Sequence, residues 1–303
     1  MKKLSYIFET AAFLSPTELD SPELTNHNYH YYMIVTSPIQ YIKDCYEKDG
    51  LMAFLLTDGE QEIEIVPPKA EGNYVIKNIT YRFTDPSHTS IMAKYSCIFE
   101  DGRICKGEAE FGGKAIYCRF APQKNLRIEY IGQSYANDGH RTSQDRLSSH
   151  STLQKILADY SCTSTKRDVE LLLLGADISI IENINVGNNG VPFVTIDGNE
   201  SQDYVNLLEA FLINFFKPKY NDKFVNGIVP SSAHTSYQEV LKENFDDFSI
   251  NVAIYGSVNN YRLFTTSNSI EINQGILNQN NRIYYSFKDA NKIDPDKYYY
   301  SFT

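Results

Sequence analysis

Tryptophan is absent from this 303-residue chain, and no run approaches the roughly 18 apolar residues that a membrane-spanning helix needs. Only five cysteines are present, with neither a Cys-x-x-Cys pair nor the Cys/His spacing of a zinc site. We therefore expect reduced, mostly buried thiols in a cytoplasmic protein that has no part in a membrane. A signal peptide is disfavoured, because acidic residues and a proline soon follow the two lysines at the N-terminus.

Basic residues are also fewer than acidic ones, with 28 Lys and Arg against 38 Asp and Glu. The formal net charge of -10 argues against a general polyanion binder whose whole surface is basic. The balance is uneven, however, because residues 101–170 contain 11 Lys and Arg against 9 Asp and Glu. On charge alone, both a phosphate-facing patch and a solvated mixed surface fit this segment.

Aromatic residues are abundant, and the 23 Tyr and 17 Phe favour β-rich packing. From residue 30 to residue 120, short β-branched or aromatic runs alternate with Gly, Pro, Asp and Asn, which predicts strands, with one helix near 37–47. Asp101-Gly102 lies between two apolar runs and predicts a hairpin. Farther along, 114–120 and 126–132 are typical of two strands joined by a turn.

A helix is predicted to follow, beginning near a capping-box-like pair, Thr142 and Asp145, and ending near residue 158. The polar run 148–152 is a point where it could break. If the helix is continuous, Arg146 and His150 lie on one stripe. An arginine suits bidentate phosphate contact, although a surface arginine and a structural histidine are common alternatives.

The strongest helical pattern covers residues 203–216 and ends at Pro218. Its apolar residues surround Glu209, and the nearest of them lie within about 60° of it on the helix surface: Val205, Leu212, Ile213 and Phe216. An ionised carboxylate on such a face is costly unless it is paired, protonated or bound to a cation. The helix alone leaves open a structural ion pair, local exposure or a functional site.

In their order along the chain, these residues resemble the GIY-YIG nuclease superfamily. The resemblance covers roughly 110–225 and rests on Ala115-Ile116-Tyr117, Tyr130-Ile131-Gly132, Arg146 with His150, Glu209, and Asn221. It implies an α+β fold, in which a small antiparallel three-stranded sheet is flanked by helices and preceded by a β-rich module. The corresponding domains are a β-rich module (1–108), a nuclease domain with insertions (109–228) and a C-terminal α/β extension (229–303).

The resemblance implies a metal-dependent endonuclease that hydrolyses phosphodiester bonds with one Mg²⁺ or Mn²⁺ ion. Tyr130 would orient or deprotonate the attacking water, and Tyr117 would hydrogen-bond near the same water. Arg146 would bind the scissile phosphate. His150 would contact phosphate or assist proton transfer, and Gly132 would let the backbone approach the substrate.

The same resemblance makes Glu209 the single protein ligand of the metal, which suits Mg²⁺ because this ion keeps most of its waters. Asn221 would hold the site together through hydrogen bonds. Several family members carry a lysine directly after YIG, whereas this chain has Gln133. Arg141 or His140 would then supply the missing charge near the substrate.

The favoured substrate is double-stranded DNA, in restriction or phage defence, with RNA as an alternative. A homodimer is plausible on mechanistic grounds, because one site cuts one strand. The competing hypothesis is a catalytically inactive nucleic-acid-binding or protein-interaction module on the same scaffold. The acidic balance and Gln133 both motivate it.

Overall fold

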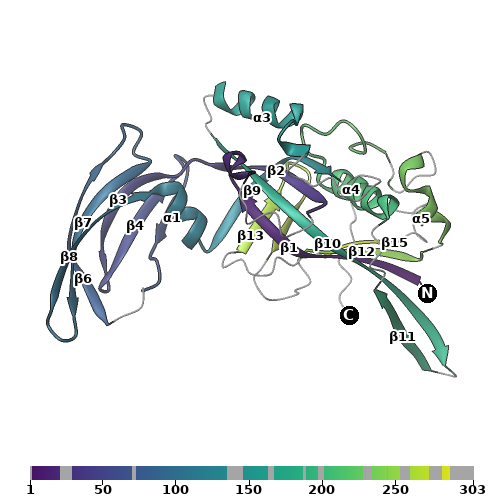
Figure 1. Ribbon diagram of the computed structural model, residues 1–303, viewed down its shortest axis with the longest axis horizontal. Coiled ribbons are helices and arrows are strands. Elements are labelled where there is room, and N and C mark those ends of the chain that lie inside the picture. The colour runs from purple at the N-terminus through teal and green to yellow at the C-terminus, as the bar shows by residue number, and fades with distance from the viewer. Residues whose placement is uncertain are drawn as a thin grey trace. The chain divides into compact units, whose positions relative to one another are not determined.

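The computed structural model is a mixed α+β fold built mostly of strands (Figure 1). The chain divides into two compact units. Unit 1 comprises Met1–Ser37, Asn125–Thr163 and Val169–Thr303, and unit 2 comprises Pro38–Lys124 and Ser164–Asp168. The structure describes residues 2–20, 29–69, 73–134, 146–162, 167–186, 189–196, 201–227, 229, 234–243, 245–252, 260–272 and 282–286.

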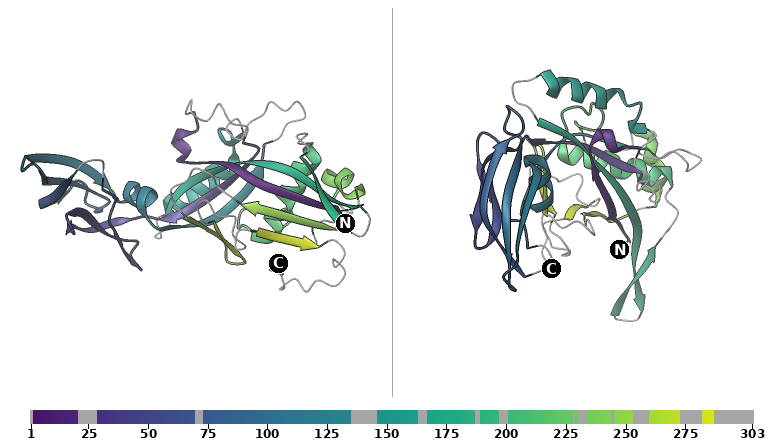
Figure 2. Two further views of the ribbon diagram at one scale, coloured as in Figure 1. Left: turned by 90° about the horizontal axis from the view of Figure 1, so that it is seen from below. Right: turned by 60° about the vertical axis from the view of Figure 1, so that its left-hand side comes forward.

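Unit 1 is built on a nine-stranded sheet in which β11 pairs with β10 and the other strands follow the order β14-β13-β9-β2-β10-β1-β12-β15 (Figure 2). Its strands are β1 (Lys2–Leu14), β2 (Tyr31–Pro38), β9 (Gln123–Gln133), β10 (Arg167–Val186), β11 (Asn189–Ile196), β12 (Asp247–Val252), β13 (Asn260–Phe264), β14 (Ser269–Ile272) and β15 (Arg282–Ser286).

The apolar run that begins at Val169 lies in the single 20-residue strand β10. Leu172 and Leu174 enter the core on one face of the sheet, whereas Leu171 and Leu173 enter the core on the other. A strand that is buried on both faces needs a continuous apolar run rather than alternation. This explains why its sequence lacks a two-residue period.

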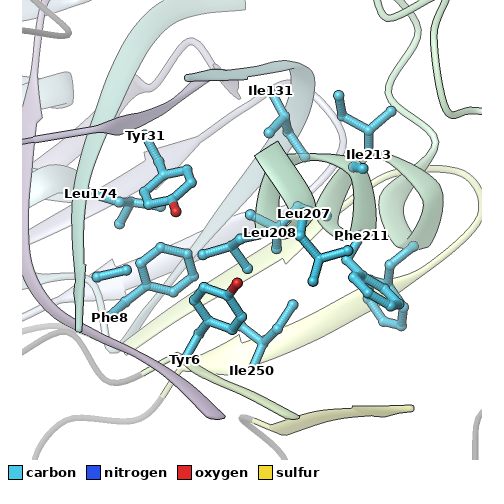
Figure 3. Close-up of a cluster of buried hydrophobic side chains, with 14 of the residues drawn as sticks. Tyr6, Phe8, Tyr31, Ile131, Leu174, Leu207, Leu208, Phe211, Ile213 and Ile250 are labelled. Carbon is cyan, nitrogen blue, oxygen red and sulfur yellow. The ribbon is translucent and has the colours of Figure 1, made fainter. Parts of the chain in front are cut away.

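Helices cover both faces of the sheet. The helical segments of unit 1 are η1 (Pro16–Glu18), α3 (Ser151–Cys162), α4 (Gln202–Phe216), η3 (Thr235–Tyr237) and α5 (Gln238–Lys242). Figure 3 shows Leu207, Leu208 and Phe211 of α4 packed near Tyr6 and Phe8. The helix predicted at 203–216 is therefore confirmed. Lys217, in a left-handed conformation, ends it just before Pro218.

Unit 2 contains two three-stranded antiparallel sheets, β3-β4-β5 and β6-β7-β8, with one helix. Its elements are β3 (Tyr41–Lys48), β4 (Leu51–Thr57), β5 (Glu62–Ile65), β6 (Tyr74–Phe83), β7 (Ser90–Phe99), β8 (Ile104–Gly112) and α1 (Gly113–Phe120). The hairpin predicted at Asp101-Gly102 is confirmed, because β7 and β8 pair across it and Gly102 has a φ of 80°.

Two sequence-based predictions of secondary structure in unit 2 are wrong. The helix expected near 37–47 is mostly the strand β3, and the strand expected at 114–120 is the helix α1. In α1 the buried residues Gly113, Ile116 and Tyr117 follow helical spacing. Apolar runs this short fit either period, so tertiary packing decides between them.

The domain boundaries also differ from the prediction. Residues 1–108 do not form one module, because β1 pairs with β10 and β2 pairs with β9. Strands from 229–303 join the same sheet, so this segment is part of unit 1. Unit 2 is instead an insertion between β2 and β9, two strands that are neighbours in the sheet. Over the described residues, no helix is long and apolar enough to cross a membrane.

Candidate functional site

The site begins at the antiparallel pairing of β2 with β9, where Tyr32 lies opposite Gly132 and Ile34 lies opposite Tyr130. The rings of Tyr32 and Tyr130 are stacked, with centroids 6.1 Å apart and planes at 27°. Gly132 makes this arrangement possible. A Cβ on Gly132 would lie 2.5 Å from Cζ and Oη of Tyr32 and 2.9 Å from Cε1 of Tyr130.

We therefore expect Gly132→Ala to destabilise the protein by about 1–3 kcal/mol, because the new methyl group overpacks the space of both tyrosine rings. Gly112→Ala is the matched control, since a Cβ there meets nothing within 4 Å. Chemical denaturation of the two variants measures the difference. Equal stabilities would contradict the close packing of Tyr32 over Gly132.

Tyr117 does not occupy the predicted position on a strand next to Tyr130. It lies in α1 and belongs to the hydrophobic core of unit 2, together with Ile116 and Ala121. The tyrosine that the sheet places beside Tyr130 is Tyr32, which the sequence analysis missed. Its sequence signal is weak, because Tyr32 is one of two adjacent tyrosines in a buried strand.

His150 lies at a break in the predicted helix, just before α3 begins at Ser151. The backbone N–H of Leu153 donates to its Nδ1 (3.3 Å), so the proton of the neutral ring is on Nε2. Nε2 lies 3.1 Å from Oη of Tyr32 and donates to it. Burial, and secondarily the charge of Arg146, lower the pKa of His150 and favour this neutral form.

Arg146 precedes this break, in a short helical turn. Its guanidinium hydrogen-bonds to the hydroxyls of both Tyr32 and Tyr130, and these bonds lower the pKa of each phenol. Burial outweighs them, so the pKa of both tyrosines is raised overall. Arg146 and His150 thus meet at the tyrosine pair, but the break between them rules out the shared helical stripe. Thr142, Asp145, His140 and Arg141 lie outside the described residues.

Tyr130 is electrostatically coupled to Glu209 as well. After burial, the carboxylate of Glu209 is the largest cause of the raised pKa of Tyr130. A hydrogen bond from Tyr32 acts in the opposite direction and lowers it. Tyr32, Tyr130, Arg146, His150 and Glu209 therefore form one interacting cluster, contributed by β2, β9, the helical turn, the start of α3, and α4.

Glu209 is partly exposed, but the surrounding protein desolvates its carboxylate and raises its pKa to about 7. Arg146, the backbone N–H of Gln133 and Lys223 each lower that pKa in part. No ion pair joins Glu209 to any other described residue. A desolvated carboxylate without a paired charge is a suitable ligand for a divalent cation.

Asn221 and Gln133 connect this cluster to the backbone. The Asn221 side chain accepts a hydrogen bond from the N–H of Ile131 (2.9 Å) and donates one to its carbonyl oxygen (2.8 Å). It thereby holds the central residue of the YIG tripeptide. The side chain of Gln133 donates to Oδ1 of Asn206 on α4 (3.2 Å), so this residue ties β9 to the helix that carries Glu209.

Among the described residues, two cations lower the pKa of Glu209: Arg146, with the larger effect, and Lys223. The sequence analysis missed Lys223, although it lies only two positions after Asn221. In the part of the chain that the structure describes, no group of three or more His, Cys, Asp or Glu residues could hold a metal ion.

Comparison with known proteins gives no relative of this chain: no family model, curated protein or solved structure matches it.

Proposed function

We propose that this protein is a metal-dependent endonuclease of the GIY-YIG type, which hydrolyses DNA phosphodiester bonds by a one-metal mechanism. The observation that carries the proposal is the convergence of Tyr130, Arg146, His150 and Glu209 from four separate elements into one coupled cluster. Glu209 is distant from the other three residues in the sequence, and the fold couples it to them. Buried titratable groups that perturb one another are typical of functional sites.

The scaffold around the cluster supports the proposal. Within the larger sheet, β9, β2 and β10 are consecutive neighbours. Residues of α3 pack on one face of these strands and residues of α4 on the other. A small sheet with flanking helices is the core that the resemblance implies, and here further strands extend it on both sides.

The hydrogen bonds suggest how Tyr130 acts. His150 donates to Tyr32, and Tyr32 donates to Tyr130. This chain of donors, together with Arg146, stabilises negative charge on the Tyr130 oxygen. Tyr130 would then accept a hydrogen bond from the attacking water and orient it. Full deprotonation is opposed by burial and by the charge of Glu209.

Arg146 is the residue best placed to bind the scissile phosphate, because a guanidinium can donate to the tyrosines and still present further N–H groups. Glu209 would hold Mg²⁺ or Mn²⁺ as the only carboxylate ligand, with waters completing the coordination. When bound, the ion supplies Lewis-acid stabilisation of the charge that develops on the phosphate. A cation at Glu209 would also remove the carboxylate charge that raises the pKa of Tyr130.

The raised pKa of Glu209 predicts a pH dependence. Below a pKa of about 7 the carboxylate is increasingly protonated, so we expect the apparent affinity for Mg²⁺ to fall by up to tenfold per pH unit. Lys223→Met removes a charge that lowers this pKa, so the acidic limb should move to higher pH. The measurement is the Mg²⁺ concentration that gives half-maximal nicking, determined from about one pH unit below the pKa of Glu209 to about two units above it.

Lys219→Met is the control for Lys223→Met, because Lys219 is a nearby exposed lysine that packs over the ring of Tyr220. It is not among the groups that shift the pKa of Glu209. A shift of the acidic limb to lower pH in Lys223→Met, or equal shifts in both variants, would contradict the assignment of Lys223.

The proposed function is tested by incubating supercoiled plasmid with the protein and Mg²⁺ or Mn²⁺. We expect nicked circles, no nicking in EDTA, and recovery when excess metal is restored. Competition with single-stranded DNA, double-stranded DNA and RNA identifies the preferred substrate. DNA binding that EDTA does not affect, without cleavage of any substrate, would instead identify the inactive binding module that Gln133 and the acidic net charge of -10 motivate.

A further inference from the structure

Unit 2 contains a pocket of about 400 Å³, formed by residues of both its sheets and of α1. This volume is within the range of ligand-binding pockets in proteins. Five aromatic side chains contribute to its lining: Phe54, Tyr74, Tyr95, Phe111 and Phe120. Phe54 is fully buried, whereas the other four are only partly buried against the core of unit 2, so their rings are available to a ligand.

Two exposed cations, Lys69 and Arg119, also line the pocket. Lys69 Nζ lies 5.4 Å from the centroid of the Tyr74 ring, and Arg119 Cζ lies 5.4 Å from that of Phe120. Neither cation forms an ion pair with a described carboxylate, whereas five other lysines of unit 2 do. Those pairs are Lys43–Glu62, Lys48–Glu64, Lys77–Glu47, Lys94–Glu108 and Lys114–Asp168.

The combination of rings and free cations indicates the chemistry of the ligand. Aromatic side chains stack on the flat face of any nucleobase, and adjacent Lys or Arg residues bind its phosphate. Glu110, which also lines the pocket, can accept a hydrogen bond from N–H groups at a base edge. Most of the described lysines of unit 2 are paired with carboxylates, so the pocket suits one nucleotide better than the backbone of a long strand.

We propose that this pocket binds a single nucleotide, with the base against the aromatic lining and the phosphate at Lys69 and Arg119. A free mononucleotide and a nucleotide extruded from duplex DNA present the same chemistry. The extruded nucleotide rests on the proposed nuclease function, and would make unit 2 the part of the chain that reads the substrate.

The first test uses the full chain carrying Glu209→Gln, so that binding is measured without cleavage. Titration calorimetry with dAMP, dCMP, dGMP and TMP should give binding that Tyr74→Ala or Arg119→Ala weakens by about 5- to 150-fold, as expected for loss of one stacked ring or one charge-assisted contact. Arg103→Ala is the matched control. Its guanidinium also lies over a ring, that of Phe99 (5.3 Å), but it pairs with Asp101 and does not line the pocket.

The second test uses a duplex that carries 2-aminopurine opposite an abasic site, where extrusion is easy. If the protein quenches the 2-aminopurine fluorescence and this quenching depends on Tyr74 and Arg119, the pocket binds an extruded base. If mononucleotides bind but the duplex shows no such quenching, the ligand is a free nucleotide. The proposal would be overturned if no nucleotide binds, or if Arg103→Ala weakens binding as much as Tyr74→Ala and Arg119→Ala do. Nucleotide binding by a protein that nicks no plasmid would refute the nuclease function and leave the pocket intact.

Discussion

Replacing Glu209 with glutamine is expected to slow Mg²⁺-dependent nicking by about 10²- to 10³-fold or more, because the only carboxylate of the cluster loses its charge. Glutamine keeps the size of the side chain and can still accept a hydrogen bond from the N–H of Gln133. The substitution also removes a charge that burial disfavours. At about one pH unit above the pKa of Glu209, we therefore expect the variant to unfold at no lower denaturant concentration than the wild type. Single-turnover nicking over a range of Mg²⁺ concentrations measures the effect.

Glu239→Gln provides the matched control, since Glu239 is an exposed glutamate on α5 that pairs with Lys242. This variant should nick at the wild-type rate. If Glu209→Gln cleaves as fast as Glu239→Gln under saturating metal, then Glu209 binds no catalytic ion. If Glu209→Gln loses activity and also unfolds at a lower denaturant concentration than Glu239→Gln, the loss of activity reflects instability and not the loss of a metal ligand.

Removing the hydroxyl of Tyr130 or Tyr32 should slow nicking much more than removing that of Tyr117. We expect Tyr130→Phe and Tyr32→Phe each to slow nicking by about 10²-fold, because one loses the group that orients water and the other loses the hydrogen bond that supports it. Tyr117→Phe should change the rate by no more than about twofold, because that hydroxyl belongs to the core of unit 2. Comparing the three variants therefore distinguishes the tyrosine found in the sheet from the one suggested by the local motif.

A pH profile separates the roles of Tyr32 and Tyr130. Tyr32→Phe removes a hydrogen bond that lowers the pKa of Tyr130, so any part of the activity that depends on the ionised Tyr130 phenol should require higher pH than in the wild type. A purely structural role for Tyr32 would reduce the rate without moving the profile. If Tyr117→Phe is the most damaging of the three variants, the positions inferred from β2 and β9 are wrong.

Local patterns in the sequence predicted several parts of this protein correctly. The helix around Glu209 was recognisable because its apolar residues recur with helical period over 14 positions, a length that few strands reach. Asp101-Gly102 identified its hairpin through the backbone conformation that such turns require. The order of Tyr130, Arg146, Glu209 and Asn221 suggested a single site, although the sequence could not show that these residues meet.

Tertiary structure alone decided the partner of Tyr130. Strand pairing brings together residues that are distant in the sequence, and unit 2 separates β2 from β9 along the chain. Ala115-Ile116-Tyr117 matched only two letters of the first family motif, and its short apolar run folds as a helix within another unit. Tyr32 has no local signal, because its role depends on facing Gly132 across the sheet.

The amino-acid sequence by itself thus pointed to Tyr130 on β9 and Glu209 on α4 as candidate site residues, because a carboxylate on an apolar helix face and a short motif are visible in local context. Only the tertiary structure decided that Tyr32 and Lys223 join them, and that residues 38–124 form an insertion rather than part of an N-terminal domain. Hydrophobic period and turn preference act over a few residues, whereas sheet register and electrostatic coupling depend on which distant segments come into contact.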